Sequence, residues 1–193
     1  ATAHNLGAGL RRKKKSVLFI DLDSQTNLSY TMDASTDGLT ILDVIQDGAD
    51  INEAIQHTAH GDIIPGTPGL ATADNTITAT GKEYRLKEAL EALNTKYDYI
   101  IIDTPAQLGI LTINALTAAN NAVIPVQTEI YSLQGIGLLN ETIDAVKKYT
   151  TPLLYVKGIL TTRYNSRAVI SRDMQDNITD LAKKLYTKCY TVP

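Results

Sequence analysis

The chain is poor in the residues that build covalent or metal-bound scaffolds. Its 193 residues include one cysteine, Cys189, three histidines and no tryptophan. A single cysteine cannot form a disulfide within the chain, and it cannot supply the several thiolates of a zinc site or iron–sulfur cluster. The histidines, at positions 4, 57 and 60, show no ligand spacing with one another or with Cys189. These absences exclude a disulfide scaffold and a cysteine-ligated metal centre within one chain.

Long apolar runs are also absent. No stretch is long enough to cross a bilayer, and no signal-peptide pattern is found. The net charge of −3 means that contact with nucleic acid would need a local basic patch. An apolar fraction of 44% in 193 residues is enough for one domain with a real core, and the composition suits a reducing compartment. We therefore expect a cytoplasmic protein with a single domain over residues 1–193.

Apolar runs of strand length alternate with helical patterns along the chain. The runs are mostly continuous, which is typical of strands buried on both faces of a parallel sheet. Strands are predicted at 17–22, 62–65, 99–103, 122–126, 153–160 and 188–192. Helices are predicted at 1–12, 41–46, 51–56, 86–93, 108–119, 133–149 and 169–186, and a loop at 71–81. This alternation predicts an α/β fold with a doubly wound, mostly parallel sheet flanked by helices.

Two of the predicted strands end in aspartates. Asp21 and Asp23 lie on one face of the first strand because side chains alternate along a strand, and Asp103 ends the run at 99–103. Ligands of open α/β sheets bind beyond the carboxyl ends of the strands, so these acids could act on one metal ion and its phosphates. The alternative is that they cap the following helices. Gln25 and Asn27 could bind phosphate or water, or simply form a turn.

Basic residues concentrate at two places. The run 11–15 (RRKKK) ends a predicted helix, where it would offset the helix dipole or contact DNA. Arg163, Arg167 and Arg172 are better candidates for DNA contact, because they follow the last long strand and could gather on one face. Binding of this kind neutralises phosphates and would weaken steeply with salt.

Several segments together resemble the ParA/Soj family of DNA-partition ATPases, in the deviant Walker group that includes MinD. They are 17–27 (VLFIDLDSQTN), 97–119 (YDYIIIDTPAQLGILTINALTAA) and 124–136 (IPVQTEIYSLQGI), and 1–10 (ATAHNLGAGL) is similar to the helix after the family's phosphate loop. The resemblance implies a P-loop NTPase fold that binds ATP and Mg²⁺. It also implies an ATP-dependent homodimer, non-specific DNA binding, a ParB-like centromere-binding partner that stimulates hydrolysis, a nucleoid-associated location and no membrane.

The resemblance also implies roles for individual residues. Asp23 matches the acid that positions the hydrolytic water, and Asp21 and Asp103 match the acids around Mg²⁺. The implied nucleotide-binding residues are Ala1, Thr2, Gln25, Asn27 and Glu129. The implied DNA-binding residue is Arg167, with Arg163 and Arg172 near it in the sequence.

The chain departs from the family pattern in two respects. Ser24 and Thr26 stand where the family has proline and glycine. The phosphate-loop pattern G-x-x-x-x-G-K-[ST] does not occur in these residues, and it would end just before Ala1. We therefore expect a piece of a longer ATPase, cut at both ends and lacking the first strand and the phosphate loop. These 193 residues alone are expected not to hydrolyse ATP.

Two other functions remain open. A MinD-like membrane-associated ATPase of division-site placement would need an amphipathic basic helix after Pro193. Comparing the protein's binding to liposomes with its binding to DNA would distinguish it from a partition ATPase. A non-catalytic scaffold or DNA-binding module would need the phosphate loop to be naturally missing, which the residues upstream of Ala1 would decide.

Overall fold

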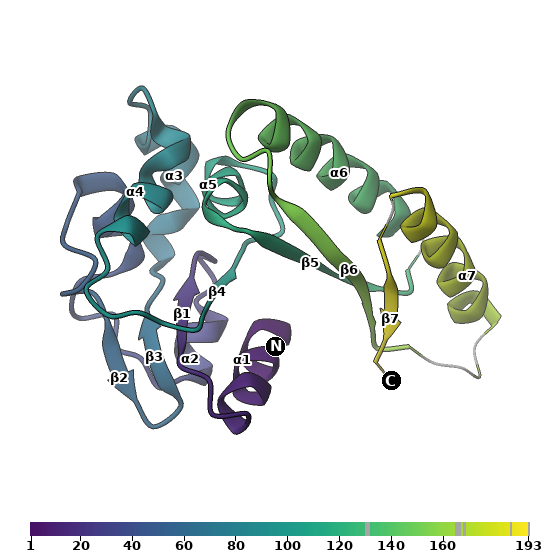
Figure 1. The fold of residues 1–193 in the computed structure, drawn as a ribbon, viewed down its shortest axis with the longest axis horizontal. Helices are drawn as coiled ribbons and strands as arrows, with labels where there is room; N and C mark the ends of the chain where they lie inside the picture. The colour runs from purple at the N-terminus through teal and green to yellow at the C-terminus, as the bar shows by residue number, and fades with distance from the viewer. Residues whose placement is uncertain (130–131, 165–166, 168, 186, 193) are drawn as a thin grey trace. The chain divides into compact units, whose positions relative to one another are not determined.

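The chain forms two compact units, Ala1–Ala118 and Ala119–Pro193, each built on its own sheet (Figure 1). The computed structural model describes residues 1–129, 132–164, 167, 169–185 and 187–192. The strand order is β2-β3-β1-β4 in the first unit and β5-β6-β7 in the second. All neighbouring strands are parallel except β2 and β3, so the predicted mostly parallel α/β fold is confirmed.

The first unit surrounds its sheet with helices. Its strands are β1 (Val17–Asp21), β2 (Gln56–Thr58), β3 (Gly61–Ile64) and β4 (Tyr99–Asp103). Its α-helices are α1 (Thr2–Arg12), α2 (Asn27–Thr31), α3 (Ala73–Thr76), α4 (Arg85–Glu91) and α5 (Ile110–Ala118). One π-helical turn, η1 (Asp43–Asp47), and two 3₁₀ turns, η2 (Pro68–Thr72) and η3 (Lys82–Tyr84), complete the unit.

The central strand β1 is buried on both faces, as its continuous apolar sequence predicts. Phe19 belongs to the cluster that α1 and α2 cover, together with Leu28 of α2. Leu18 and Ile20 belong to the opposite cluster, with residues of α4 and α5. Successive side chains of a strand point to opposite faces, so one short run anchors helices on both sides of the sheet.

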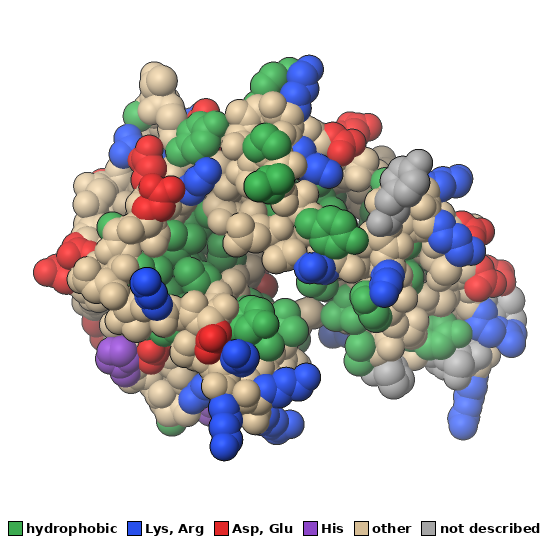
Figure 2. Space-filling view, viewed as in Figure 1, with side chains coloured by type: hydrophobic (Ala, Val, Ile, Leu, Met, Phe, Trp, Pro, Cys, Tyr) green, Lys and Arg blue, Asp and Glu red, His purple; other side chains and the backbone are tan. Residues whose placement is uncertain are grey.

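Helix α1 packs closely on the sheet because it carries a glycine at the contact. A Cβ atom built on Gly7 would overlap the ring of Phe19, which is 1% exposed. After α1, Lys14 adopts a left-handed backbone conformation (φ 61°) that turns the chain into β1. The basic run 11–15 therefore lies at the exposed end of α1, where Figure 2 shows lysine and arginine side chains gathered.

The second unit has the same strand–helix alternation. It consists of β5 (Asn121–Gln127), α6 (Ser132–Tyr149), β6 (Tyr155–Thr162), α7 (Val169–Lys184) and β7 (Cys189–Thr191). Its core includes Ile143 of α6, Ile159 of β6 and Ile178 of α7. None of the helices among the described residues has both the length and the hydropathy to span a bilayer.

Two predictions about local structure are wrong. Residues 51–56 form a turn that leads into β2 instead of a helix, because both polar groups of the Gln56 side chain bond to the backbone of Ser35 and hold the segment extended. The predicted loop at 71–81 contains α3, because Ala73 and Ile77 are buried in the core. The last residue of the predicted helix 169–186, Tyr186, lies outside the described residues.

Two glycines of α1 predict opposite effects of the same substitution. Alanine at Gly7 would overlap Phe19, and overpacking costs about 1–3 kcal/mol, more than the ~1 kcal/mol that alanine gains in a helix. A methyl group on Gly9 would meet no atom within 4 Å apart from the helix's own backbone, so Gly9→Ala should stabilise the protein by about 0.5–1 kcal/mol. Urea unfolding measures both changes, and equal effects would contradict the packing of α1.

Candidate functional site

The acids that end β1 and β4 lie side by side at the carboxyl edge of the sheet. Asp21 is paired in register with Asp103, so their Cα atoms are about 4.8 Å apart, the usual spacing of paired strands. Burial raises the pKa of Asp103, the α-amino group of Ala1 lowers it, and the charges of Asp21 and Asp23 raise it, with a net upward shift. The structure therefore brings together the three predicted acids and the start of α1.

Asp21 is a buried acid with its acceptor sites largely used. Its Oδ2 accepts hydrogen bonds from the backbone N–H of Ser29 at 2.8 Å and from the Ser29 hydroxyl at 2.7 Å, and its Oδ1 accepts one from the N–H of Asp23 at 3.1 Å. The side chain is fully buried. Three donors to one carboxylate stabilise its charge, and they fix the loop that carries Asp23.

The loop after β1 is a tight turn built around Asp23. The side chain of Asp23 accepts a hydrogen bond from the N–H of Gln25 at 3.0 Å, and its carbonyl accepts one from the N–H of Thr26 at 2.9 Å. Thr26 has φ 52°, a left-handed conformation that is strained for a β-branched residue and free of strain for glycine. This is the position at which the chain departs from the glycine of the family pattern.

The end of β3 closes against this loop through Gly66. Its N–H donates a hydrogen bond to the Ser29 hydroxyl at 2.9 Å. A Cβ atom at this position would lie 2.8 Å from the carbonyl oxygen of Asp21 and 3.2 Å from that of Asp23. Only glycine allows so close an approach, so Gly66 helps to fix the loop although no sequence motif singled it out.

A cavity of about 260 Å³ opens beside Asp23. Its lining includes Gln25, Asp74, Pro105 and Gln107. Asp74 accepts a hydrogen bond from the N–H of Ile110 at 2.6 Å, which caps the first turn of α5 and holds the loop that follows β4. Sequence reasoning missed Asp74, because it comes from a separate segment of the chain with no recognisable pattern.

The donor set fits a magnesium ion that phosphate and water help to hold. Among the described residues, no three acidic, histidine or cysteine side chains are placed to hold a metal by themselves. Mg²⁺ commonly takes one or two carboxylates and completes its shell with water and substrate phosphate. Within the described part of the chain, the carboxylate of Asp103 accepts no hydrogen bond. A half-buried carboxylate without donors is suited to a cation.

The remaining predicted site residues are more dispersed. Thr2 begins α1 next to Ala1, and the exposed Asn27 begins α2. Glu129, exposed, follows β5 in the second unit. The DNA-binding candidates lie in the connection from β6 to α7 or in the first turns of α7, and all three are exposed: Arg163, Arg167 and Arg172.

The raised pKa of Asp103 predicts that this acid lowers the stability of the nucleotide-free protein. A raised folded-state pKa means that stability falls as the pH rises from the ordinary value of 3.8 through the raised value. Asp103→Asn should therefore raise the melting temperature at pH 7 by a few degrees, and the gain should vanish near pH 3.

Asp98, at the other end of β4, is the matched control. The backbone N–H of Ser16 lowers its pKa, so its contribution to stability is present above the ordinary value of 3.8 and is lost at lower pH. Asp98→Asn should lower the melting temperature at pH 7. Thermal melts over pH 3–8 check both signs, and destabilisation by Asp103→Asn at pH 7 would contradict the repulsion among the acids.

Proteins of similar sequence place this chain in a known family. A family model described as an AAA domain matches residues 1–156. The chromosome partitioning protein ParA of Myxococcus xanthus is 37% identical over 188 residues, which cover 95% of this chain and 66% of that protein. The sporulation initiation inhibitor protein Soj of Bacillus subtilis is 42% identical over 171 residues, which cover 86% of this chain and 68% of that protein. The chain thus spans about two thirds of the length of these relatives.

A solved structure has a similar fold and itself contains a nucleotide and magnesium. A cobyrinic acid a,c-diamide synthase from Mycobacterium smegmatis, with bound ADP and magnesium, superposes with a TM-score of 0.84 at 34% identity, covering 93% of this chain and 74% of that one. The P-loop ATPase fold, the strand-end acids and the similarity to ParA and Soj lead to one conclusion. The chain belongs to the ParA/Soj family of partition ATPases.

Proposed function

We propose that the whole protein is a Mg²⁺-dependent ATPase that segregates DNA. In this proposal ATP joins two subunits, the dimer binds DNA without sequence preference, and a ParB-like protein stimulates hydrolysis. The observation that carries the proposal is the convergence of Asp21, Asp23 and Asp103 at the start of α1, with Asp103 repelled by the other two. Such a cluster is costly unless a cation and a phosphate ligand use it.

The three acids divide the work. Asp21, which the family resemblance assigns to Mg²⁺ together with Asp103, also anchors the loop, because its buried carboxylate accepts three hydrogen bonds. Asp23, held by the N–H of Gln25, would orient the attacking water and accept its proton, and Asp103 would help to hold the metal. Mg²⁺, when bound, neutralises charge on the transferring phosphate. Backbone N–H groups at the start of α1, from Ala1 and Thr2, would bind the phosphates, since helix N-termini favour anions.

Three further polar residues are assigned to the nucleotide by the family resemblance. Gln25 lines the cavity beside Asp23, and Asn27 starts the helix that Asp21 anchors through Ser29. Both can donate amide hydrogens to phosphate or water. Glu129 follows the carboxyl end of β5, the edge at which ligands of such sheets bind.

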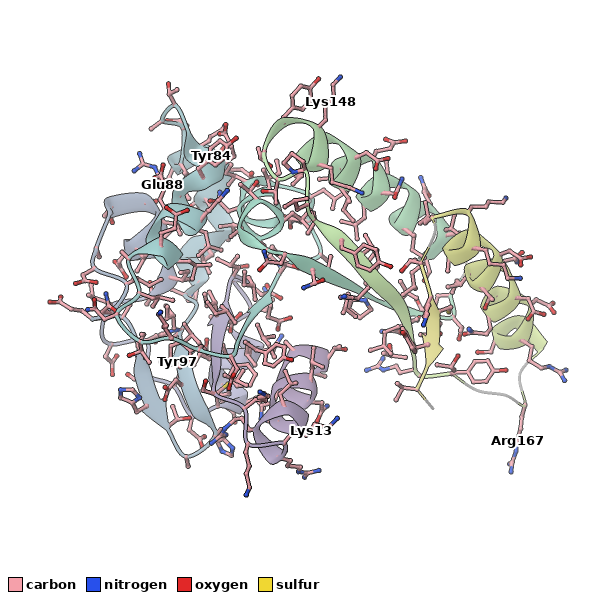
Figure 3. The ribbon with its side chains drawn as sticks, in the orientation of Figure 1. Lys13, Tyr84, Glu88, Tyr97, Lys148 and Arg167 are labelled. Atoms are coloured by element: carbon pink, nitrogen blue, oxygen red, sulfur yellow. The ribbon has the colours of Figure 1, made fainter. Side chains whose placement is uncertain are left out.

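The charge distribution supports a role of the second unit in DNA binding. That unit has 9 basic and 6 acidic side chains, a net charge of +3, whereas the first unit has 9 basic and 15 acidic ones, a net charge of −6. Figure 3 shows Arg167 extending outward from the connection between β6 and α7. Arg163 and Arg172 come from the same stretch, so three guanidinium groups could contact successive phosphates.

The role of Asp23 predicts a separation of binding from hydrolysis. Asp23→Asn keeps an oxygen that can accept from Gln25 but loses the charge, so ATP binding should persist while turnover falls about 10²–10⁴-fold. Single-turnover hydrolysis and nucleotide titration of the full-length protein with Mg²⁺ measure both. Asp47→Asn, an exposed acid of the same unit, is the control and should change neither. Turnover by Asp23→Asn at the unmutated rate would remove Asp23 from this role.

Arg167 predicts a defect limited to DNA. Arg167→Ala in the full-length protein should weaken binding to a random-sequence duplex by up to about tenfold in ~0.1 M salt and leave ATP affinity unchanged. Lys147→Ala, an exposed cation of α6, is the control. Fluorescence anisotropy over a salt series makes the measurement, and an unchanged affinity at low salt would exclude Arg167.

A further inference from the structure

The basic run at the end of α1 is the densest cationic feature of the first unit. Five of that unit's nine basic side chains are consecutive, from Arg11 to Lys15, and all five residues are exposed. The run lies at the amino end of β1, whereas Asp21 lies at its carboxyl end, a strand length away. A partner bound to the run would therefore leave the nucleotide site accessible.

Three of these cations have no partner within the described part of the chain. Arg11 donates to the carbonyl of His60, and Lys15 pairs with Asp98 at 3.5 Å. The side chains of Arg12, Lys13 and Lys14 make neither an ion pair nor a hydrogen bond with any described residue. They therefore present uncompensated charge to solvent.

Ending the helix does not require these cations. The carbonyl of Leu10 accepts hydrogen bonds from the N–H groups of Lys13 and Lys15, and that of Arg11 accepts one from Lys14. Two of the last carbonyls of α1 thus already have backbone donors. Lys14 has φ 61°, a conformation in which glycine is unstrained and lysine is not. The chain carries a cation at a turn that its backbone would form more easily with glycine.

The surface suits a polyanion in water more than a lipid bilayer. A helix that lies in a membrane interface needs a broad exposed apolar face. Helix α1 buries Ala3 and Gly7 against the sheet, and its most exposed large apolar side chain is Leu6, at 47%. Duplex DNA presents about one charge per 1.7 Å of its axis, and cations bind it through phosphates without any apolar contact.

We infer that Arg12, Lys13 and Lys14 form a second DNA contact, on the first unit, that supplements the arginines of the second unit. The inference rests on the proposed function for the existence of DNA binding. It assigns a part of that binding to a surface at the opposite end of the sheet from the nucleotide site. Each phosphate contact contributes about 0.9 to the slope of log affinity against log salt concentration.

A pair of charge-matched variants of the full-length protein tests the inference. Lys13→Gln with Lys14→Gln removes two cations from the end of α1, and Lys147→Gln with Lys148→Gln removes two from the last turn of α6. With ATP and a random-sequence duplex, the first pair should reduce the salt slope by about 1.8 and weaken binding at ~0.1 M salt by about 10- to 60-fold. The second pair should change neither, and ATP hydrolysis should be unchanged in both.

A third variant, Lys14→Gly, distinguishes the loss of a DNA contact from a loss of stability. Glycine removes the backbone strain at φ 61°, so this variant should melt at a higher temperature and yet bind DNA more weakly.

Equal DNA binding by the Lys13/Lys14 variant and the unmutated protein would overturn the inference and leave the proposed function intact. An unmutated protein that binds no DNA would overturn the proposed function itself. Loss of binding to phosphatidylserine vesicles, with DNA binding unchanged, would instead assign the run to a membrane.

Discussion

The burial of Asp21 is the constraint on which the site depends. A carboxylate without access to water costs several kcal/mol unless donors replace the water, and here three donors do so. Two of them belong to Ser29, whose hydroxyl also accepts from the N–H of Gly66. The loop after β1, the first turn of α2 and the end of β3 must therefore be in place together. The position of Asp23 follows from that assembly.

Asp103 has the opposite environment from its neighbour in register. The carboxylate of Asp21 accepts three hydrogen bonds, whereas that of Asp103 is half-buried, accepts none within the described residues and is repelled by two acids. The two acids therefore have different roles. Asp21 stabilises the loop, whereas Asp103 is repelled by its neighbours, and a bound cation would cancel that repulsion. Sites that bind charged ligands commonly carry such a cost in the unliganded protein.

The sequence was informative where local pattern decides the structure. The continuous apolar run of β1 predicts a central, buried parallel strand, and the strand-end rule places Asp21 beside Asp103. The similar run of β4 also forms a parallel strand, but it is the last strand of the sheet in the first unit and is only partly buried. The supporting contacts could not be predicted, because they join distant segments. Gly66 is 37 residues from Ser29, and Asp74 is 36 residues from Ile110. No spacing rule relates such positions, and the strand β2 was missed because tertiary hydrogen bonds determine it.

In the first unit, acidic and basic residues lie at opposite ends of β1. The acids of the site lie at one end of this strand, and the cations 11–15 lie at the other, separated by about 17 Å of extended chain. This arrangement gives the region an electric dipole moment directed along the sheet. The field of a negatively charged rod exerts a torque on this dipole, which turns the cationic end toward the rod and the acids of the site away from it. Under the proposed function, this orientation keeps the nucleotide site open to solvent while the protein is bound to DNA.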